Sequence, residues 1–182
     1  MAIPLDDAPD QAPPDPVVLV DADPAWPGTF TRIRERVASA LGDLTLAIDH
    51  VGSTAVPGLP AKPIVDVDVV VPVGGVSEAI ERLATLGYVH RGDLGVAGRE
   101  AFARPPGTPP HHLYVCARDA PECRRHLVFR DYLRAHPDVA LAYADLKKEL
   151  ARRFRDDRAA YSQAKSAFVE DVLRRAGAGG DP

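Results

Sequence analysis

The stretch IVDVDVVV, residues 64–71, constrains the fold more than any other part of this 182-residue chain. Its β-branched residues predict a buried strand, yet it contains two aspartates, Asp66 and Asp68. Because side chains alternate between the faces of a strand, we expect both carboxylates on one face and the intervening valines on the other, in the core. Two neighbouring carboxylates repel each other unless a cation lies close to both, although such pairs also occur as solvated residues at strand ends.

Hydrophobic spacing divides the remaining chain into a mixed first half and a helical second half. The first half is expected to contain helices at 26–41 and 76–87 and strands at 17–20, 44–51, 64–71, 88–91, 99–104 and 111–117. The second half is expected to contain helices at 121–135, 137–154 and 157–176. A half rich in strands followed by a helical half predicts an α+β fold with the C-terminal helices packed against a mixed sheet.

Length and composition indicate one globular domain, expected over residues 16–176. Residues 1–15 are acidic and rich in proline, which predicts a disordered tail and does not resemble a signal peptide; residues 177–182 are expected to be frayed. A net charge of −4 provides no general attraction for nucleic acid, and no apolar run is long enough for a membrane span. Neither a zinc nor a redox spacing relates Cys116 to Cys123, so reduced cysteines and a cytoplasmic location are expected.

A Gly-Ser turn precedes the aspartate pair and adds groups that suit phosphate. Gly52 allows the backbone to approach a ligand closely, and the hydroxyls of Ser53 and Thr54 are donors. Lys62 supplies a positive charge within reach of a phosphate. Carboxylate ligands favour Mg²⁺ or Mn²⁺, which binds one or two carboxylates together with phosphate oxygens. The combination predicts a site for a nucleoside triphosphate, with the metal at Asp66 and Asp68.

Several stretches resemble the GrpB-like proteins, a branch of the nucleotidyltransferase superfamily that includes DNA polymerase beta. The resemblance extends over residues 17–175 and rests on DADPAWPGTF, DHVGSTAVPGLPAKPIVDVDVVV, LGYVHRG, HHLYVC, RRHLVFRDYLRAHPDVALAYADLKKELA and DDRAAYSQAKSAFVEDVL. It implies a nucleotidyltransferase-type core, a Gly-Ser motif at Gly52 and Ser53, and a metal-binding pair at Asp66 and Asp68. Family members also occur fused to dephospho-coenzyme A kinase.

The resemblance also implies a third carboxylate on a later strand, and this sequence departs from that pattern. The corresponding stretch HHLYVC has His112 where a carboxylate is expected and Tyr114 where the family has a histidine. His112 is either a catalytic or metal-binding group or a hydrogen-bonded structural histidine. Glu100, on a neighbouring strand, is an alternative source of the carboxylate.

Basic residues on the predicted helices have two interpretations each. Arg125, Arg130 and His126 either belong to a solvated helix face or turn towards phosphates, and Arg130 has Asp131 as a possible ion-pair partner. Lys165 lies four residues after Tyr161, so it either packs its stem against the ring or contacts a triphosphate.

These features predict a metal-dependent nucleotidyltransferase that moves a nucleotidyl group from a nucleoside triphosphate to a small-molecule acceptor. Catalysis is expected to depend on Asp66, Asp68 and His112, and nucleotide binding on the residues Gly52, Ser53, Thr54, Lys62, Arg125, Arg130 and Lys165. The alternatives are a non-catalytic nucleotide- or metabolite-binding module and a different ATP-dependent reaction at the same site.

Overall fold

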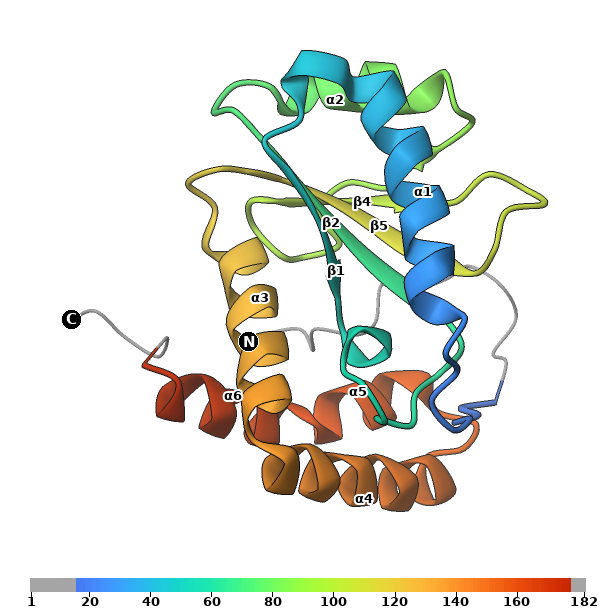
Figure 1. Ribbon diagram of the computed structural model, residues 1–182, viewed down its shortest axis with the longest axis vertical. Coiled ribbons are helices and arrows are strands. Elements are labelled where there is room, and N and C mark those ends of the chain that lie inside the picture. The colour runs from blue at the N-terminus through green and yellow to red at the C-terminus, as the bar shows by residue number, and fades with distance from the viewer. Residues whose placement is uncertain (1–15, 178–182) are drawn as a thin grey trace.

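A five-stranded sheet forms the centre of the computed structural model, which describes residues 16–177 (Figure 1). The strands lie in the order β1-β2-β5-β4-β3; β2 and β5 are parallel, and the other neighbours are antiparallel. Their bounds are β1 Ala47–Val51, β2 Val65–Val71, β3 Val89–His90, β4 Arg99–Ala103 and β5 His111–Ala117. The expected α+β fold with a mixed sheet is therefore confirmed.

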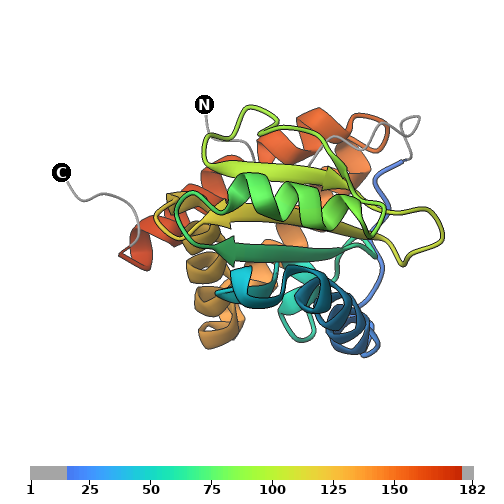
Figure 2. The ribbon, with the colours of Figure 1, turned by 90° about the horizontal axis from the view of Figure 1, so that it is seen from above.

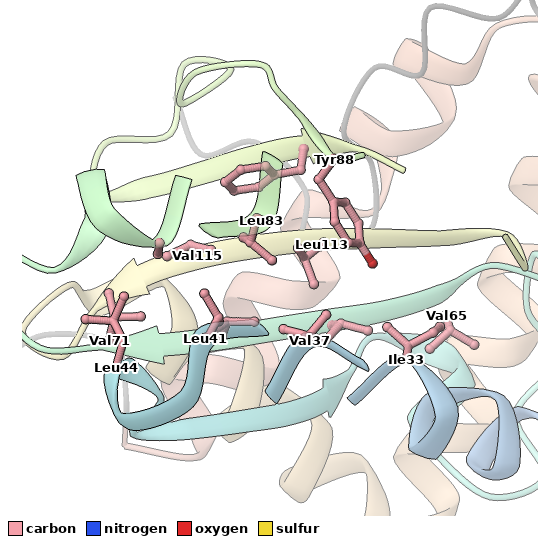
Figure 3. Close-up of a cluster of buried hydrophobic side chains, with 14 of the residues drawn as sticks. Ile33, Val37, Leu41, Leu44, Val65, Val71, Leu83, Tyr88, Leu113 and Val115 are labelled. Carbon is pink, nitrogen blue, oxygen red and sulfur yellow. The ribbon is translucent and has the colours of Figure 1, made fainter. Parts of the chain in front are cut away.

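One face of the sheet is apolar and is covered by α1 (Trp26–Leu41) and α2 (Val76–Ala84) (Figure 2). The odd-numbered valines of β2 and the Leu113 and Val115 side chains of β5 face these helices, as alternation predicts. Figure 3 shows Val37, Leu41 and Leu83 of the two helices packed on this layer. Because the odd-numbered valines of β2 and Leu113 and Val115 of β5 are buried in this core, the even-numbered residues of the two strands project from the opposite face of the sheet.

Four helices follow the sheet and bury their apolar residues in two further clusters, a larger one that includes Val56 and Leu59 and a smaller one formed by Val17, Leu150 and Tyr161. They are α3 (Pro121–Ala135), α4 (Pro137–Arg153), α5 (Arg158–Ala164) and α6 (Ser166–Arg175). Phe129, Tyr143 and Val172 are buried in the larger cluster, and α4 and α5 lie next to the short helix η2 (Ser53–Ala55) (Figure 1). The helix expected over 157–176 is wrong in one respect, because it is interrupted at Lys165.

Two other local expectations are corrected. The strand expected at 17–20 is a single bridge between Val20 and Ala61. Cys116 and Cys123 form a disulfide between the end of β5 and the first turn of α3, so the expectation of reduced cysteines is wrong. A disulfide favours an oxidising compartment, whereas the location was expected to be cytoplasmic.

The tail expected at 1–15 lies outside the described residues, as do residues 178–182 of the tail expected at 177–182. Within residues 16–177, no helix has both the length and the apolar character needed to cross a bilayer.

Candidate functional site

Asp66 and Asp68 lie on the sheet face opposite the apolar core, as their alternation with valine predicts. Asp66 is 4% exposed and Asp68 is 1% exposed. In the parallel pair of β2 and β5, Asp66 is opposite His112 and Asp68 is opposite Tyr114. Directly paired residues project on the same side of a sheet, so the two carboxylates, His112 and Tyr114 share one polar face.

Each carboxylate accepts a hydrogen bond from a different histidine. The Nδ1–H of His112 donates to Asp66 Oδ1 over 2.7 Å, and the Nδ1–H of His126 on α3 donates to Asp68 Oδ2, also over 2.7 Å. His126 is as deeply buried as its partner. The strand-borne carboxylates are therefore paired with one histidine from the sheet and one from the helix that covers it.

The buried charges alter the protonation of their neighbours. Burial acts to lower the pKa of His126, but the charge of Asp68 and its hydrogen bond outweigh burial, and the pKa is raised. Asp49 on β1 lies directly across from Asp68. Burial raises the pKa of the Asp49 carboxyl; Arg130 opposes this, and the charge of Asp68 adds to it. Negative charge is therefore concentrated on the polar face of the sheet. Protonated groups around the carboxylates compensate part of this charge.

The Gly-Ser turn lies at the end of β1, where it begins η2. Gly52 has φ 69° and ψ −170°, a conformation available essentially to glycine alone. Ser53 Oγ accepts a hydrogen bond of 3.0 Å from Lys147 Nζ on α4, and the same ammonium donates to the carbonyl of Pro60 over 2.5 Å. A buried cation is therefore held against the serine that the sequence assigns to phosphate binding.

Other predicted phosphate contacts surround the same place. One pocket is lined by residues of the Gly-Ser turn, by one carboxylate with its histidine and by two lysines; its lining residues are Leu19, Ser53, Thr54, Ala61, Lys62, Ile64, Asp66, His112, Lys147 and Tyr161. Lys62 Nζ lies 5.8 Å and Lys165 Nζ 4.5 Å from the centre of the Tyr161 ring. The Thr54 hydroxyl is hydrogen bonded to His50 Nε2 at 2.9 Å. The structure thus brings together the Gly-Ser turn, Lys62, Asp66 and His112.

Two predicted nucleotide contacts on α3 have other partners. Arg125 is paired with Glu122 and Glu170, which tie α3 to itself and to α6. Arg130 donates to the carbonyl of His50 at 2.9 Å and is paired with the neighbouring Asp131. Neither arginine lines the pocket around Ser53.

Glu100 is not the missing carboxylate. It is opposite Val115 on β5, so its side chain projects towards the face of α1 and α2, where it accepts from His90 Nε2 over 2.5 Å. A third carboxylate does lie on the polar face, but it is Asp49 of β1, which the sequence did not single out. The sequence clue to Asp49 was its position two residues before Val51, in the strand that precedes the Gly-Ser turn.

Arg99 was also missed. Its side chain is 1% exposed, its guanidinium lies 4.3 Å from the centre of the Tyr114 ring, and its nitrogens have no hydrogen-bond partner in the described chain. The cation–π contact partly replaces the water that the guanidinium gives up.

The residues fit a hard divalent cation. Asp68 Oδ1 is buried and has no hydrogen-bond partner among residues 16–177. This oxygen and Asp66 supply the carboxylate donors that magnesium and manganese prefer. However, no group of three or more histidine, cysteine, aspartate or glutamate side chains in the described part of the chain has the arrangement of a complete metal site. A metal bound here would therefore need further ligands from water or from a bound molecule.

Comparisons with known proteins identify the family of this chain. The family model described as GrpB protein matches residues 16–175. The chain belongs to the GrpB family. It is 41% identical to UPF0157 protein PA4798 of Pseudomonas aeruginosa, covering 89% of this chain and 68% of that protein. It is 38% identical to UPF0157 protein YqkA of Bacillus subtilis, covering 83% of this chain but only 44% of that protein.

A protein named dephospho-CoA kinase from Mycolicibacterium paratuberculosis is 30% identical to this GrpB chain, which covers 46% of it. The sequence implies a relation to dephospho-coenzyme A kinases, and the similarity extends over less than half of that kinase.

Solved structures show the same fold. The crystal structure of GrpB from Enterococcus faecalis is 33% identical, covers 87% of this chain and 96% of its own, and has a TM-score of 0.79. Cid1 in complex with the UTP analogue UMPNPP has a TM-score of 0.51 at 12% identity, covering 73% of this chain and 43% of Cid1. At that identity the likeness concerns the fold alone, and it establishes a nucleotidyltransferase-like core for this GrpB protein.

Proposed function

We propose that this GrpB protein is a metal-dependent nucleotidyltransferase that uses a nucleoside triphosphate and a small-molecule acceptor. The observation that carries the proposal is the convergence of Ser53, Lys147, Asp66 and His112 around one pocket of a nucleotidyltransferase-like fold. A hydroxyl and a buried ammonium suit phosphate, and the adjacent carboxylates suit the cation that accompanies it.

Each group has a position that suggests its task. Ser53 and Lys147 would hold the β- and γ-phosphates, with Lys147 exchanging its contact with Ser53 for one with phosphate. Asp66 and Asp68 would hold Mg²⁺ or Mn²⁺, which when bound neutralises charge on the phosphates. Catalysis would then rest on positioning and charge neutralisation at the α-phosphorus.

His112 would assist the acceptor. Its Nδ1–H donates to Asp66, so Nε2 is the ring nitrogen that remains to meet an acceptor. An acceptor hydroxyl beside His112 would donate to Nε2 as its oxygen approaches the α-phosphorus. The hydrogen bond to Asp66 fixes the ring in the orientation that this requires.

The first test is a panel of nucleotides and metals read by thermal unfolding, followed by measurement of pyrophosphate release. A ligand that binds only the native state raises the unfolding temperature, so we expect a shift from one triphosphate that depends on magnesium. Release is measured with and without a deproteinised bacterial metabolite extract as the source of acceptor. A nucleotide shift with no pyrophosphate release in either condition would favour the non-catalytic binding module instead.

A double variant tests the carboxylates directly. Asp66→Asn with Asp68→Asn is expected to remain folded and to lose pyrophosphate release. The matched control is Asp138→Asn with Asp145→Asn, which makes the same charge change at exposed positions of α4. Undiminished release by the first double variant would refute the metal assignment.

Two neighbouring lysines test the phosphate contact. Lys147→Met keeps an apolar stem but removes the buried ammonium, and it is expected to abolish the nucleotide-dependent shift. Lys148→Met alters the adjacent exposed lysine and is expected to retain it. Equal loss in both variants would show that general charge, rather than the contact with Ser53, binds the nucleotide.

A further inference from the structure

A large cavity lies beside the proposed nucleotide site and has basic residues in its wall. Its volume is about 640 Å³. Four cationic side chains line it, from Lys62, Arg91, Arg104 and Arg158, and none of the lining residues that the structure describes is acidic. Much of the remaining wall is apolar, including Phe102. Such a cavity suits a small molecule with an anionic group and an uncharged body.

The cavity and the pocket around Ser53 are contiguous. Both are lined by Lys62, Ile64 and His112. Because His112 is paired with Asp66 in the β2–β5 register and hydrogen bonded to it, the cavity approaches Asp66 through His112, from the side of β5 and β4. Ser53 follows β1, on the other side of β2 in the sheet order. The carboxylates therefore lie between the proposed phosphate contact and the cavity.

This placement matches the requirements of an in-line displacement. In such a reaction the attacking and leaving oxygens lie on opposite sides of the phosphorus. If pyrophosphate leaves towards Ser53 and Lys147, the acceptor must approach from the side of β5, which is where the cavity lies. The positive charge of the cavity wall also favours the acceptor over the nucleoside as the occupant. The nucleoside part of a triphosphate is uncharged, so it would not use the basic side chains.

We propose that the cavity binds the acceptor and that this acceptor carries a phosphate group, an inference that rests on the proposed nucleotidyltransferase function. Arg91 and Arg104 would contact that phosphate, since guanidinium groups match it with two hydrogen bonds. A hydroxyl of the acceptor would point towards His112. Its oxygen forms a bond to the α-phosphorus, the bond from that phosphorus to the bridging oxygen of pyrophosphate breaks, and the hydroxyl proton passes to water.

The test compares two probes that differ only by a phosphate, ribose 5-phosphate and ribose, by calorimetric titration of the full chain. We expect ribose 5-phosphate to bind and ribose to bind far more weakly. Arg91→Gln with Arg104→Gln should weaken ribose 5-phosphate binding by about tenfold or more. The control Arg118→Gln with Arg124→Gln, which makes the same charge change at positions outside the cavity, should bind as the unmodified protein does.

Nucleotide binding separates this inference from the proposed function. We expect the Arg91 and Arg104 double variant to keep the magnesium-dependent nucleotide shift, and Lys147→Met to lose that shift while still binding ribose 5-phosphate. Loss of the nucleotide shift in the arginine double variant would make the cavity a nucleoside site and overturn the inference. Equal binding of ribose 5-phosphate by both arginine double variants, or no binding by the unmodified protein, would overturn it too. An absent nucleotide shift in the unmodified protein would instead refute the proposed function.

Discussion

Replacing His126 with phenylalanine tests how the Asp68 carboxylate is stabilised inside the protein. The two side chains are each 1% exposed, and His126 supplies the hydrogen bond to Oδ2. The other oxygen, Oδ1, has no hydrogen-bond partner in the described chain. Phenylalanine keeps an aromatic ring in place but removes the donor. Because an uncompensated buried charge remains, we expect the free energy of unfolding to fall by about 3–5 kcal/mol.

A double-mutant cycle isolates the charge contribution. In an Asp68→Asn background there is no carboxylate to leave unpaired, so His126→Phe should cost only about 1–2 kcal/mol for a lost neutral hydrogen bond. The difference between the two backgrounds is the coupling energy, expected to be about 2 kcal/mol or more.

Urea unfolding in the presence of a chelator, and without nucleotide, measures the free energy of unfolding of each variant in the cycle. Arg125→Met is the control on the same helix, because its ion pairs are partly exposed and are expected to contribute about 1 kcal/mol or less. If His126→Phe costs the same in the unmodified protein as in the Asp68→Asn background, to within about 0.5 kcal/mol, the pair is not a charged couple and the reasoning is refuted.

The raised pKa of His126 gives the same test a pH dependence. A histidine whose folded-state pKa lies above its unfolded value contributes stability that is complete below the unfolded pKa, near 6.5, and is lost as the pH rises through the folded pKa. The stability difference between the unmodified protein and His126→Phe should therefore be largest in mildly acidic buffer and should narrow in alkaline buffer. A difference that widens towards alkaline pH would contradict the assigned charge.

Three further predictions concern other parts of the molecule. Burial lowers the pKa of His50 and of His111 to about 4, so the unfolded state takes up protons first and stability should fall as the pH drops from about 6.5 to about 4. His111→Gln should reduce the steepness of that fall in urea titrations at each pH. Reduction of the Cys116–Cys123 disulfide, which links residues seven apart, should lower the free energy of unfolding by about 2.5 kcal/mol, measured with and without dithiothreitol. Gly52→Ala should lower it by about 1–3 kcal/mol and remove the nucleotide-dependent thermal shift, because alanine is strained at φ 69° and ψ −170°.

Local periodicity predicted much of the fold because each element buries its own apolar face. The helix expected at 26–41 is Trp26–Leu41, and that expected at 121–135 is Pro121–Ala135. In the strand at 64–71, alternation alone placed the two aspartates on one face and the valines in the core. The break at Lys165 was not predictable in this way, because the apolar spacing continues through it from Tyr161 to Val172.

The partners of the site residues were harder to predict because they come from distant parts of the chain. His112 lies 46 residues from Asp66, His126 lies 58 residues from Asp68, and Lys147 lies 94 residues from Ser53. A helical pattern states which residues share a face, but it does not state which strand that face meets. Arg125 was therefore as good a candidate as its neighbour His126, and only the packing of α3 on the sheet distinguishes them.

The polar face of the sheet explains why the C-terminal helices do not extend the apolar core that α1 and α2 form on the opposite face. Asp66, Asp68 and His112 occupy positions where an ordinary sheet would carry apolar side chains, so α3 cannot seal that face by hydrophobic burial alone. The C-terminal helices instead bury their apolar residues against one another and against Val56 and Leu59, and their polar contacts include His126 with Asp68 on the sheet and Lys147 with Ser53 on η2. The geometry of the candidate site consequently depends on ionisation and hydrogen bonding, and ligands that alter the charge at Asp68 or Ser53 should alter how the helices hold the sheet.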